Sequence, residues 1–462
     1  MSVETSSVLP AAQTTATAPR LTRDTGFLAM LTTQFLGAFN DNLFKQMVLL
    51  LCADLLAAGG PKRESWAQAL FAIPFVLFSG FAGWLSDRTP KRTIIVSMKA
   101  AEALIMLAGM SAFLIGGNDL GRQLALLLGV LFLMGTHSAF FGPAKFGILP
   151  EMLQKPDLPN ANGLVLMTTF VAIIFGQALA GYAKDWFEGR LWVISAMCIG
   201  IAFLGFLTSL FVRRTPIAHP GLELRKSSLL IDTDTWQMLR SDRPLMRVLL
   251  VSSLFWFLGG VVNIVANPLG RFVMGYSDSR TSMANACMGV GIAIGCMVAA
   301  KLSHRTVNFG LVRLGGWGLV GSLGAVAVLG WRASLVPLGE RGGAESFLAL
   351  LVPRQPFEVQ LRLVMALVGV FAGLFVVPLQ VFLQARPPED KKGRMIGVMN
   401  LINWIGIVLS AGFHGALSAG MSAAGIGIEG VERNAHWEFA VLALLMLPIA
   451  AFYRPPSLDL KA

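Results

Sequence analysis

Long apolar runs separated by short polar segments fill nearly the whole chain of 462 residues. Most of these runs approach or exceed about 20 residues, the length that an α-helix needs to cross the hydrocarbon core of a bilayer. The first and seventh runs are longer than usual, so these helices are expected to tilt, to break or to extend beyond the lipid. The pattern predicts about twelve membrane-spanning helices, at roughly residues 26–56, 66–86, 93–116, 122–141, 162–183, 191–212, 246–275, 282–302, 309–331, 358–382, 395–418 and 436–453.

A polar stretch near the middle of the chain, residues 213–245, leaves six predicted helices on each side. We therefore predict an all-α membrane protein with two pseudo-symmetric six-helix halves, residues 26–212 and 246–453, joined by a central cytoplasmic loop at 213–245. Phe35-Leu36-Gly37 in the first run is echoed by Phe257-Leu258-Gly259 in the seventh, as an internal duplication would leave. Parallel halves related by an axis normal to the membrane place a substrate site between them, near the midplane.

Composition and charge agree with a bilayer as the solvent. The chain is 55% hydrophobic and only 14% charged, whereas charged residues make up about a quarter of a typical soluble domain. Lys and Arg gather in alternate loops, with 24 in the segments predicted to be cytoplasmic and 12 in the opposite loops. This asymmetry predicts that both termini are cytoplasmic, and it attributes the net charge of +11 to the positive-inside pattern rather than to nucleic-acid binding.

The two ends of the chain are predicted to be tails. Residues 1–25 are rich in Ser, Thr, Ala and Pro and lack the basic and apolar regions of a signal peptide, so a disordered cytoplasmic tail is expected there. Residues 454–462 form the second predicted cytoplasmic tail. The four cysteines fall within apolar segments without metal-ligand spacing, and we predict no metal site and no cofactor.

The first predicted helix carries polar residues deep in an apolar run, Asn40-Asp41-Asn42 followed by Lys45. Charged side chains inside a membrane are costly and usually face a cavity or a partner, so we predict a functional site here. Lys45 lies one helical turn beyond Asp41, and an intrahelical ion pair that only fixes packing is the alternative. Aligning the halves by the Phe-Leu-Gly echo sets Asp41 against Asn263 and Lys45 against Asn267, which predicts a polar site contributed by both halves.

Glu102 is a further acid within an apolar run, in the third predicted helix. The sequence leaves two interpretations open. Glu102 either pairs with Lys99, which precedes it by three residues on the same helix face, or it belongs to a proton or ion relay.

The segment after the second predicted helix reads Gly83-Trp84-Leu85-Ser86-Asp87-Arg88-Thr89-Pro90-Lys91-Arg92. It resembles the cytoplasmic signature of the major facilitator superfamily, with Pro90 in place of the usual second Gly; the alternative is an ordinary basic loop. The resemblance implies the major facilitator fold and a role in conformational gating for Gly83, Asp87, Arg88, Lys91 and Arg92. Gly83 would allow close helix approach, and Asp87 would accept hydrogen bonds from a neighbouring helix N-terminus.

A second motif is more specific. Phe141-Gly142-Pro143-Ala144-Lys145-Phe146-Gly147-Ile148-Leu149 is followed by Ala161-Asn162-Gly163-Leu164. Together with Asp41-Asn42, these segments resemble the bacterial lysophospholipid transporter family, with Phe146 in place of that family's Tyr. The resemblance implies a flippase of the inner membrane that moves lysophosphatidylethanolamine-like lipids to the cytoplasmic leaflet for re-acylation. Some relatives carry Arg where this chain has Asn263, which puts the head-group preference in question.

The predicted site residues suit such a lipid. Lys145 can meet a phosphate as a point charge, Asp41 can meet an ethanolamine ammonium, and we place Asn42, Lys45, Asn263 and Asn267 in the same substrate site. Two other functions stay open: a proton-coupled exporter of amphipathic drugs that uses Asp41 or Glu102, and a membrane protein that binds without transporting.

Enzyme functions find no support in the sequence. His-Glu-x-x-His, Gly-x-Ser-x-Gly and P-loop motifs are absent from the chain. Some members of the lysophospholipid transporter family are fused to an acyltransferase with a His-x-x-x-x-Asp motif, but here His137 is followed five residues later by Gly142. Re-acylation would therefore require a separate acyltransferase.

Overall fold

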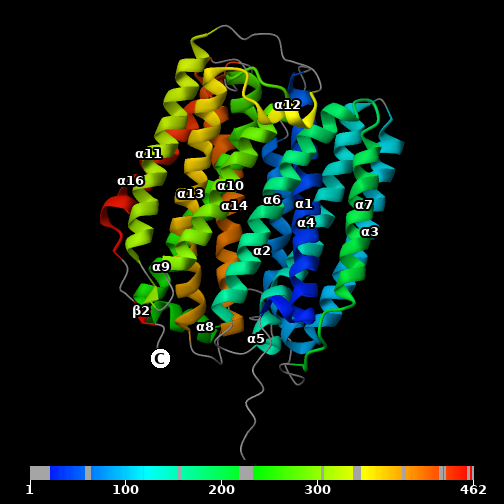
Figure 1. The fold of residues 1–462 in the computed structure, drawn as a ribbon, viewed down its shortest axis with the longest axis vertical. Helices are drawn as coiled ribbons and strands as arrows, with labels where there is room; N and C mark the ends of the chain where they lie inside the picture. Colours follow the sequence, from blue (N-terminus) through cyan, green and yellow to red (C-terminus); the bar gives the residue numbers. More distant parts are fainter. Residues whose placement is uncertain are drawn as a thin grey trace, which may run out of the picture.

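Twelve long helices, one for each predicted apolar run, form the body of the computed structural model (Figure 1). The structure describes residues 21–57, 64–117, 119–153, 158–217, 233–302, 306–307, 309–336, 345–387, 392–425, 430, 433–454 and 458–459. The first six long helices are α1 Thr25–Ala57, α2 Glu64–Arg88, α3 Lys91–Gly116, α4 Leu120–Gly147, α6 Leu158–Trp186 and α7 Trp192–Ser209. The second six are α9 Arg243–Pro268, α10 Asp278–Leu302, α11 Phe309–Ser334, α13 Pro356–Ala385, α14 Lys392–Ala423 and α16 His436–Phe452.

Short elements precede, connect or follow these helices. They are η1 Leu21–Arg23, α5 Leu149–Met152, α8 Thr233–Ser241, the π-helix η4 Leu269–Val273, α12 Phe347–Leu351, and the strands β1 Thr306–Val307 and β2 Leu458–Asp459. The strands pair antiparallel, with Thr306 opposite Asp459 and Val307 opposite Leu458. Of the three alternatives for the long seventh run, the structure shows a break: α9 ends at Pro268, which lacks a backbone donor, and η4 continues it.

Most of the long helices suit a membrane by length and composition alone. Among the described residues, ten helices are long and apolar enough to cross a bilayer, and α16 is an apolar helix of 17 residues. The helix α1 is not among the ten although it has 33 residues. Its polar positions, among them Asn40–Asn42 and Lys45, lower its hydropathy, and the same positions carry the predicted site.

The edges of the predicted segments differ from the structure in three places. Residues 21–25 are not a disordered tail, because Asp24 is buried, accepts a hydrogen bond from the Phe27 backbone and pairs with Arg213 at 2.9 Å. The predicted central loop contains the helix α8 and the first turn of α9, where the Asp242 side chain caps α9. The predicted C-terminal tail contains β2. Residues 1–20 and 218–232 lie outside the described part of the chain.

Glycines bring α10 and α13 into backbone contact. Gly291 and Gly295 on α10 face the carbonyl oxygens of α13, where an added Cβ would lie 2.0 and 2.1 Å from the nearest one. On α13, a Cβ at Gly369 would lie 1.7 Å from the Met288 carbonyl oxygen. Gly373 follows Gly369 at the same four-residue spacing, the small-residue pattern that lets membrane helices pack closely.

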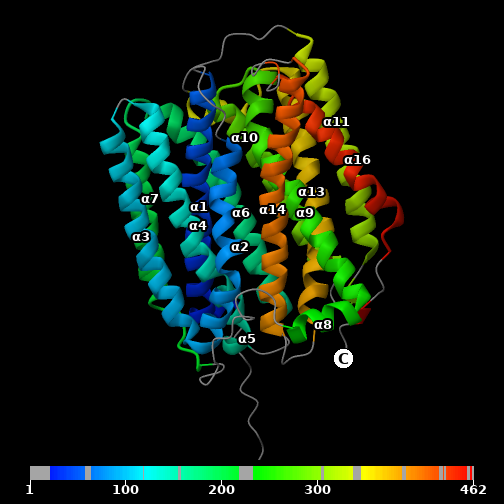
Figure 2. The ribbon, with the colours of Figure 1, turned by 180° about the vertical axis from the view of Figure 1, so that it is seen from behind.

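The two halves meet mainly through two helix pairs, α6 against α10 and α2 against α14, and less extensively through pairs such as α1 against α9. Figure 2 shows α14 beside α2, although these helices belong to different halves. We call the end where α1 begins and α16 ends the terminal face, and the other end the distal face. The helix α12 lies at the distal face, while α5 and α8 lie at the terminal face (Figure 1).

Candidate functional site

A buried polar cluster joins α1, α3 and α4 inside the N-terminal half. Glu102 on α3 is fully buried and accepts hydrogen bonds from the Asn40 amide at 2.7 Å and from the Lys99 ammonium at 2.6 Å. His137 on α4 places its Nε2 atom 3.6 Å from the same carboxylate. We call Asn40, Asp41, Lys99, Glu102, His137 and Ser138 the polar cluster.

Asp41 occupies the part of the polar cluster nearest to α4. Its Oδ2 atom accepts a hydrogen bond of 2.6 Å from the Ser138 hydroxyl, and its Oδ1 atom is buried without a partner. Asn40 Oδ1 and His137 Nδ1 are also buried without a hydrogen-bond partner. Three unsatisfied polar atoms in one buried cluster are costly, and they mark a place where a ligand, water or proton would be stabilised.

The polar cluster bears on two sequence interpretations. The Lys99–Glu102 pair, one of the two alternatives for Glu102, is present. The possible Asp41–Lys45 ion pair is absent from the described contacts: Asp41 turns to Ser138 on α4, while the Lys45 ammonium lies 5.3 Å from the Phe71 ring centroid on α2. The spacing allowed the pair, but in the structure Asp41 contacts α4 and Lys45 contacts α2.

The candidate phosphate ligand Lys145 lies near the end of α4, where it contacts Gln34 of α1, and Gln34 in turn contacts α6. Its ammonium donates to Gln34 Oε1 at 3.3 Å and lies 4.9 Å from the Phe146 ring centroid. Gln34 also accepts from Thr169 at 2.8 Å and donates to Thr168 at 2.6 Å, so α6 fixes its orientation. A lysine has three donors, and a single long hydrogen bond leaves capacity for an anion.

Two hydrogen bonds, Lys145–Gln34 and Ser138–Asp41, join the antiparallel helices α1 and α4 at different heights, and we call each of them a step of this helix pair. Gln34 and Asp41 are seven residues apart on α1, and their partners Lys145 and Ser138 are seven residues apart on α4. Seven residues are two helical turns, so both steps lie on the same face, about 10 Å apart along the axis. One step carries a cation and the other an anion.

The other predicted substrate residues do not gather at this place. The Asn42 amide donates to the Ala38 carbonyl of its own helix at 2.7 Å. Asn267 accepts from Gln46 at 2.9 Å and thereby connects α9 to α1, so its bond joins the two halves. Asn263 is half-buried, with its Oδ1 atom buried and unpartnered. Asn267 therefore acts in an inter-half contact in this structure.

The predicted gating residues lie at the terminal face. Lys91 forms an ion pair with Glu151 on α5, and Arg92 donates to the Leu210 carbonyl at 2.7 Å. Arg88 lies 5.3 Å from the Trp84 ring centroid, and Asp87 is half-buried. The close helix approach expected at Gly83 is wrong for this structure, because a Cβ added there would meet no described atom within 4 Å.

Sequence reasoning missed a group of ion pairs that connects the halves at the distal face. Asp54 on α1 pairs with Arg271 on η4 and with Lys184 on α6, each at 2.9 Å. Lys184 and Arg271 also pair with Asp278 on α10, and we call these four residues the inter-half ion cluster. The described inter-half hydrogen bonds, including that from the Ser279 backbone to Asp185 at 3.0 Å, all lie toward the distal face.

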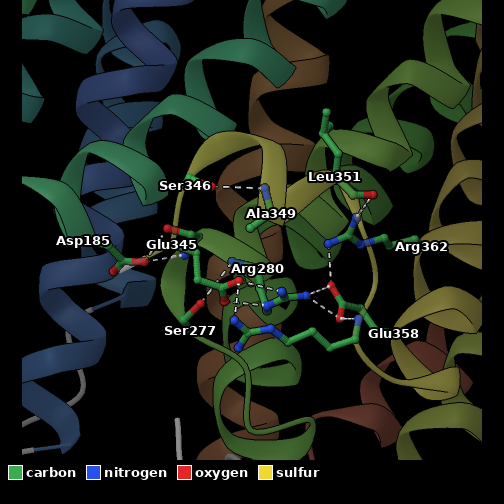
Figure 3. A network of polar contacts seen from close by, with 11 residues as sticks. Asp185, Ser277, Arg280, Glu345, Ser346, Ala349, Leu351, Glu358 and Arg362 are labelled. Carbon is green, nitrogen blue, oxygen red and sulfur yellow. Dashed lines mark hydrogen bonds and ion pairs between the residues drawn. The ribbon is translucent and has the colours of Figure 1, made fainter. Parts of the chain in front are cut away.

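A second distal network lies within the C-terminal half (Figure 3). Arg280 on α10 donates to Glu345 at 2.7 Å and to Glu358 on α13 at 2.6 Å, and Glu358 also pairs with Arg362. The hydrogen bonds from Arg280 hold the pKa of Glu345 below its ordinary value. This network fastens the segment before α12 to the helices beneath it. Only the Glu358–Arg362 pair, four residues apart on α13, had a local signal in the sequence, because Arg280 lies far from both of its acidic partners in the chain.

The polar cluster has the ligand spacing of a metal site but not the charge for one. Ligand atoms of Asp41, Glu102 and His137 lie within 4.8 Å of one another, as a cation site would need. The Lys99 ammonium, however, already lies 2.6 Å from Glu102 and would repel a second cation there.

Comparisons with known proteins agree with this architecture. The family model described as Major Facilitator Superfamily matches residues 30–411. The lysophospholipid transporter LplT of Enterobacter sp. (strain 638) is 28% identical over 414 residues, which cover 87% of this chain and 91% of that protein. The protein of the same name from Klebsiella pneumoniae (strain 342) is 29% identical over 419 residues, with 87% and 91% covered.

Solved structures share the fold at lower identity. The human organic anion transporter MFSD10 superposes with a TM-score of 0.61 at 15% identity, covering 92% of this chain and 99% of that one. A bacterial homologue of the iron transporter ferroportin gives a TM-score of 0.57 at 15% identity, with 91% and 99% covered.

Proposed function

This chain belongs to the Major Facilitator Superfamily, and from that premise we propose that it transports lysophospholipids. Its similarity to proteins named lysophospholipid transporter extends over 87% of the chain. We propose more specifically a flippase that moves lysophosphatidylethanolamine-like lipids to the cytoplasmic leaflet of a bacterial inner membrane, where a separate acyltransferase re-acylates them.

The observation that carries this proposal is the pair of oppositely charged steps between α1 and α4. Lys145, with two unused donors, offers a site for the phosphate, and Asp41, with an unpartnered oxygen, offers a site for the ammonium. A separation of about 10 Å along the helix pair suits a zwitterionic head group with a hydrogen bond at each end. Apolar walls of the surrounding helices would hold the single acyl chain.

The proposed topology places both termini in the cytoplasm, so that the terminal face is cytoplasmic and the inter-half ion cluster is periplasmic. In this arrangement, the described inter-half bonds hold the halves together on the periplasmic side. We further propose that Gly83, Asp87, Arg88, Lys91 and Arg92 control opening at the cytoplasmic side. The support is that Lys91 and Arg92 bind α3 to α5 and to the end of α7.

Uptake of labelled lysophosphatidylethanolamine by spheroplasts that express the protein tests this function. We expect selective uptake of the lysolipid over a diacyl lipid, and loss of that uptake in Asp41→Asn. Asp119→Asn is the matched control, because Asp119 is exposed and only caps α4. If the protein is folded in the membrane and uptake stays at background, the proposal fails and amphipathic drugs become the next substrates to assay.

A further inference from the structure

The charges of the polar cluster are paired unequally. Glu102 has direct cationic contact, because the Lys99 ammonium lies 2.6 Å away. Asp41 has no such contact: its one described hydrogen bond comes from the neutral Ser138 hydroxyl. A carboxylate inside a membrane protein is stable only when its charge is compensated, so the cluster is short of one positive charge at Asp41.

The other groups around Asp41 do not supply this charge by contact. On α1, Lys45 lies against Phe71, and on α4, Lys145 bonds to Gln34. The helix α7 contributes the buried Ser195 hydroxyl and the buried Cys198 thiol, and α2 contributes apolar rings, among them Phe71, Phe75 and Phe78.

His137 is the group that can supply the charge. Its side chain is 6% exposed, its Nε2 atom lies 3.6 Å from Glu102, and one of its ring nitrogens lies within 4.8 Å of a carboxylate oxygen of Asp41. Its Nδ1 atom is buried and has no partner. Histidine exchanges a proton near neutral pH, and a protonated ring has two donors, whereas a neutral ring has one donor and one acceptor.

We propose that Asp41, Glu102 and His137 form a binding site for one proton that competes with the ammonium group of the substrate. The proton comes from water and binds a ring nitrogen of His137, and no covalent bond other than this N–H forms. With His137 protonated, Asp41 is compensated from within the cluster and attracts an ammonium weakly. With His137 neutral, the substrate ammonium supplies the missing charge. This inference rests on the proposed function, because it assigns the ammonium to Asp41.

Direct binding to the purified protein in detergent at pH 5.5 to 8 tests the competition. Two lipids are compared: lysophosphatidylethanolamine, which carries an ammonium, and lysophosphatidylglycerol, which does not. We expect the dissociation constant of the first to rise as pH falls, by up to about tenfold per pH unit below the titration of the site. The dissociation constant of the second should change much less.

The variant His137→Gln should remove the pH dependence and still bind lysophosphatidylethanolamine. Ser138→Ala is a second variant that leaves His137 in place and should keep the pH dependence. His436→Gln is the matched control, because His436 is also buried but lies on α16 in the other half. Substrate binding should release close to one proton at pH 6 in the wild type and none in His137→Gln.

The two proposals fail in distinguishable ways. Absence of binding of either lipid at every pH would reject the lysophospholipid function. Binding with the same pH dependence in the wild type and in His137→Gln would reject only the proton site. Binding that follows the Na⁺ concentration at constant pH would replace the proton by a metal cation and would likewise overturn the inference.

Discussion

The Lys99 ammonium occupies the space that a side chain on Gly37 would need: a Cβ built at Gly37 would lie 2.1 Å from Lys99 Nζ and 3.3 Å from Lys99 Cε. Gly37 on α1 therefore lets the lysine of α3 reach Glu102. The echo of this glycine in the other half has no such role, because a Cβ at Gly259 would meet no described atom within 4 Å. The internal repeat thus preserves the glycine but not its contact.

Replacing Gly37 by Ala should displace the Lys99 ammonium and weaken its ion pair with Glu102. Removing one partner of a buried ion pair outright costs about 3–5 kcal/mol. Because the displaced atoms are the flexible end of Lys99, we expect a smaller loss, measured as a fall in the melting temperature of the detergent-solubilised protein. Gly259→Ala should change the melting temperature little. Combining Gly37→Ala with Glu102→Gln should recover part of the loss, and a double variant as unstable as Gly37→Ala alone would contradict the explanation.

Lys145→Gln should weaken lysophospholipid binding. A hydrogen bond to a charged group contributes about 1.5–3 kcal/mol, which corresponds to about a tenfold to hundredfold rise in the dissociation constant. Because Lys145 is proposed to bind the phosphate, the loss should be similar for lipids with and without an ammonium group. The exposed Lys301 on α10 provides the control Lys301→Gln. Equal affinities for Lys145→Gln and the wild type would exclude the phosphate role.

Asp54→Asn should loosen the halves at the distal face, because Asp54 pairs with both Arg271 and Lys184. The reporter is the variant Ser282→Cys, because Ser282 is fully buried and faces Gly181 of the other half. In a background without the native cysteines, we expect faster alkylation of this cysteine by an impermeant maleimide.

The control for that experiment is Asp242→Asn, which removes an ion pair with Arg386 inside the C-terminal half. It should leave the alkylation rate at residue 282 unchanged. Identical rates in Asp54→Asn and in the unaltered background would show that the inter-half ion cluster does not hold the distal face closed.

Gly369→Ala should prevent stable folding. Its Cβ would lie 1.7 Å from the Met288 carbonyl oxygen, and a backbone atom cannot rotate away as a side chain can. The helices α10 and α13 would have to separate, and overpacking of this severity should cost at least about 3 kcal/mol. Size-exclusion chromatography should show loss of the monodisperse peak, whereas Gly324→Ala on α11, which meets no described atom within 4 Å, should retain it.

Glu345 should make the stability depend on pH in the acidic range. Because Arg280 lowers the pKa of Glu345 from its ordinary value of 4.5, the carboxylate stabilises the folded protein above that value. This contribution is lost as the pH falls through the lowered pKa. The melting temperature of Glu345→Gln should therefore lie below that of the wild type at pH 7, and the gap should narrow below pH 4.5. Glu188→Gln, at an exposed position, should show no such pattern.

Some contacts of the structure have a local signal in the sequence. The four-residue spacing of Gly291 with Gly295 and of Gly369 with Gly373 is visible in the printed chain, and it predicts close packing of the two helices that carry it. Sequence spacing also suggested Lys99 as a partner for Glu102, since i and i+3 share a helix face. His137 had no comparable signal, because it lies 35 residues from Glu102 in the chain.

The sequence by itself determined the number of long helices, the division into two halves and the presence of charges within apolar runs at Asp41, Lys45 and Glu102. These features follow from local properties, namely the length of an apolar run and the cost of a charge within it. Only the tertiary structure decided which groups those charges meet. Asp41 could pair with Lys45 on its own helix, yet Ser138 on α4 lies closer. Packing of neighbouring helices chooses between such partners, and that choice depends on residues distant in the chain.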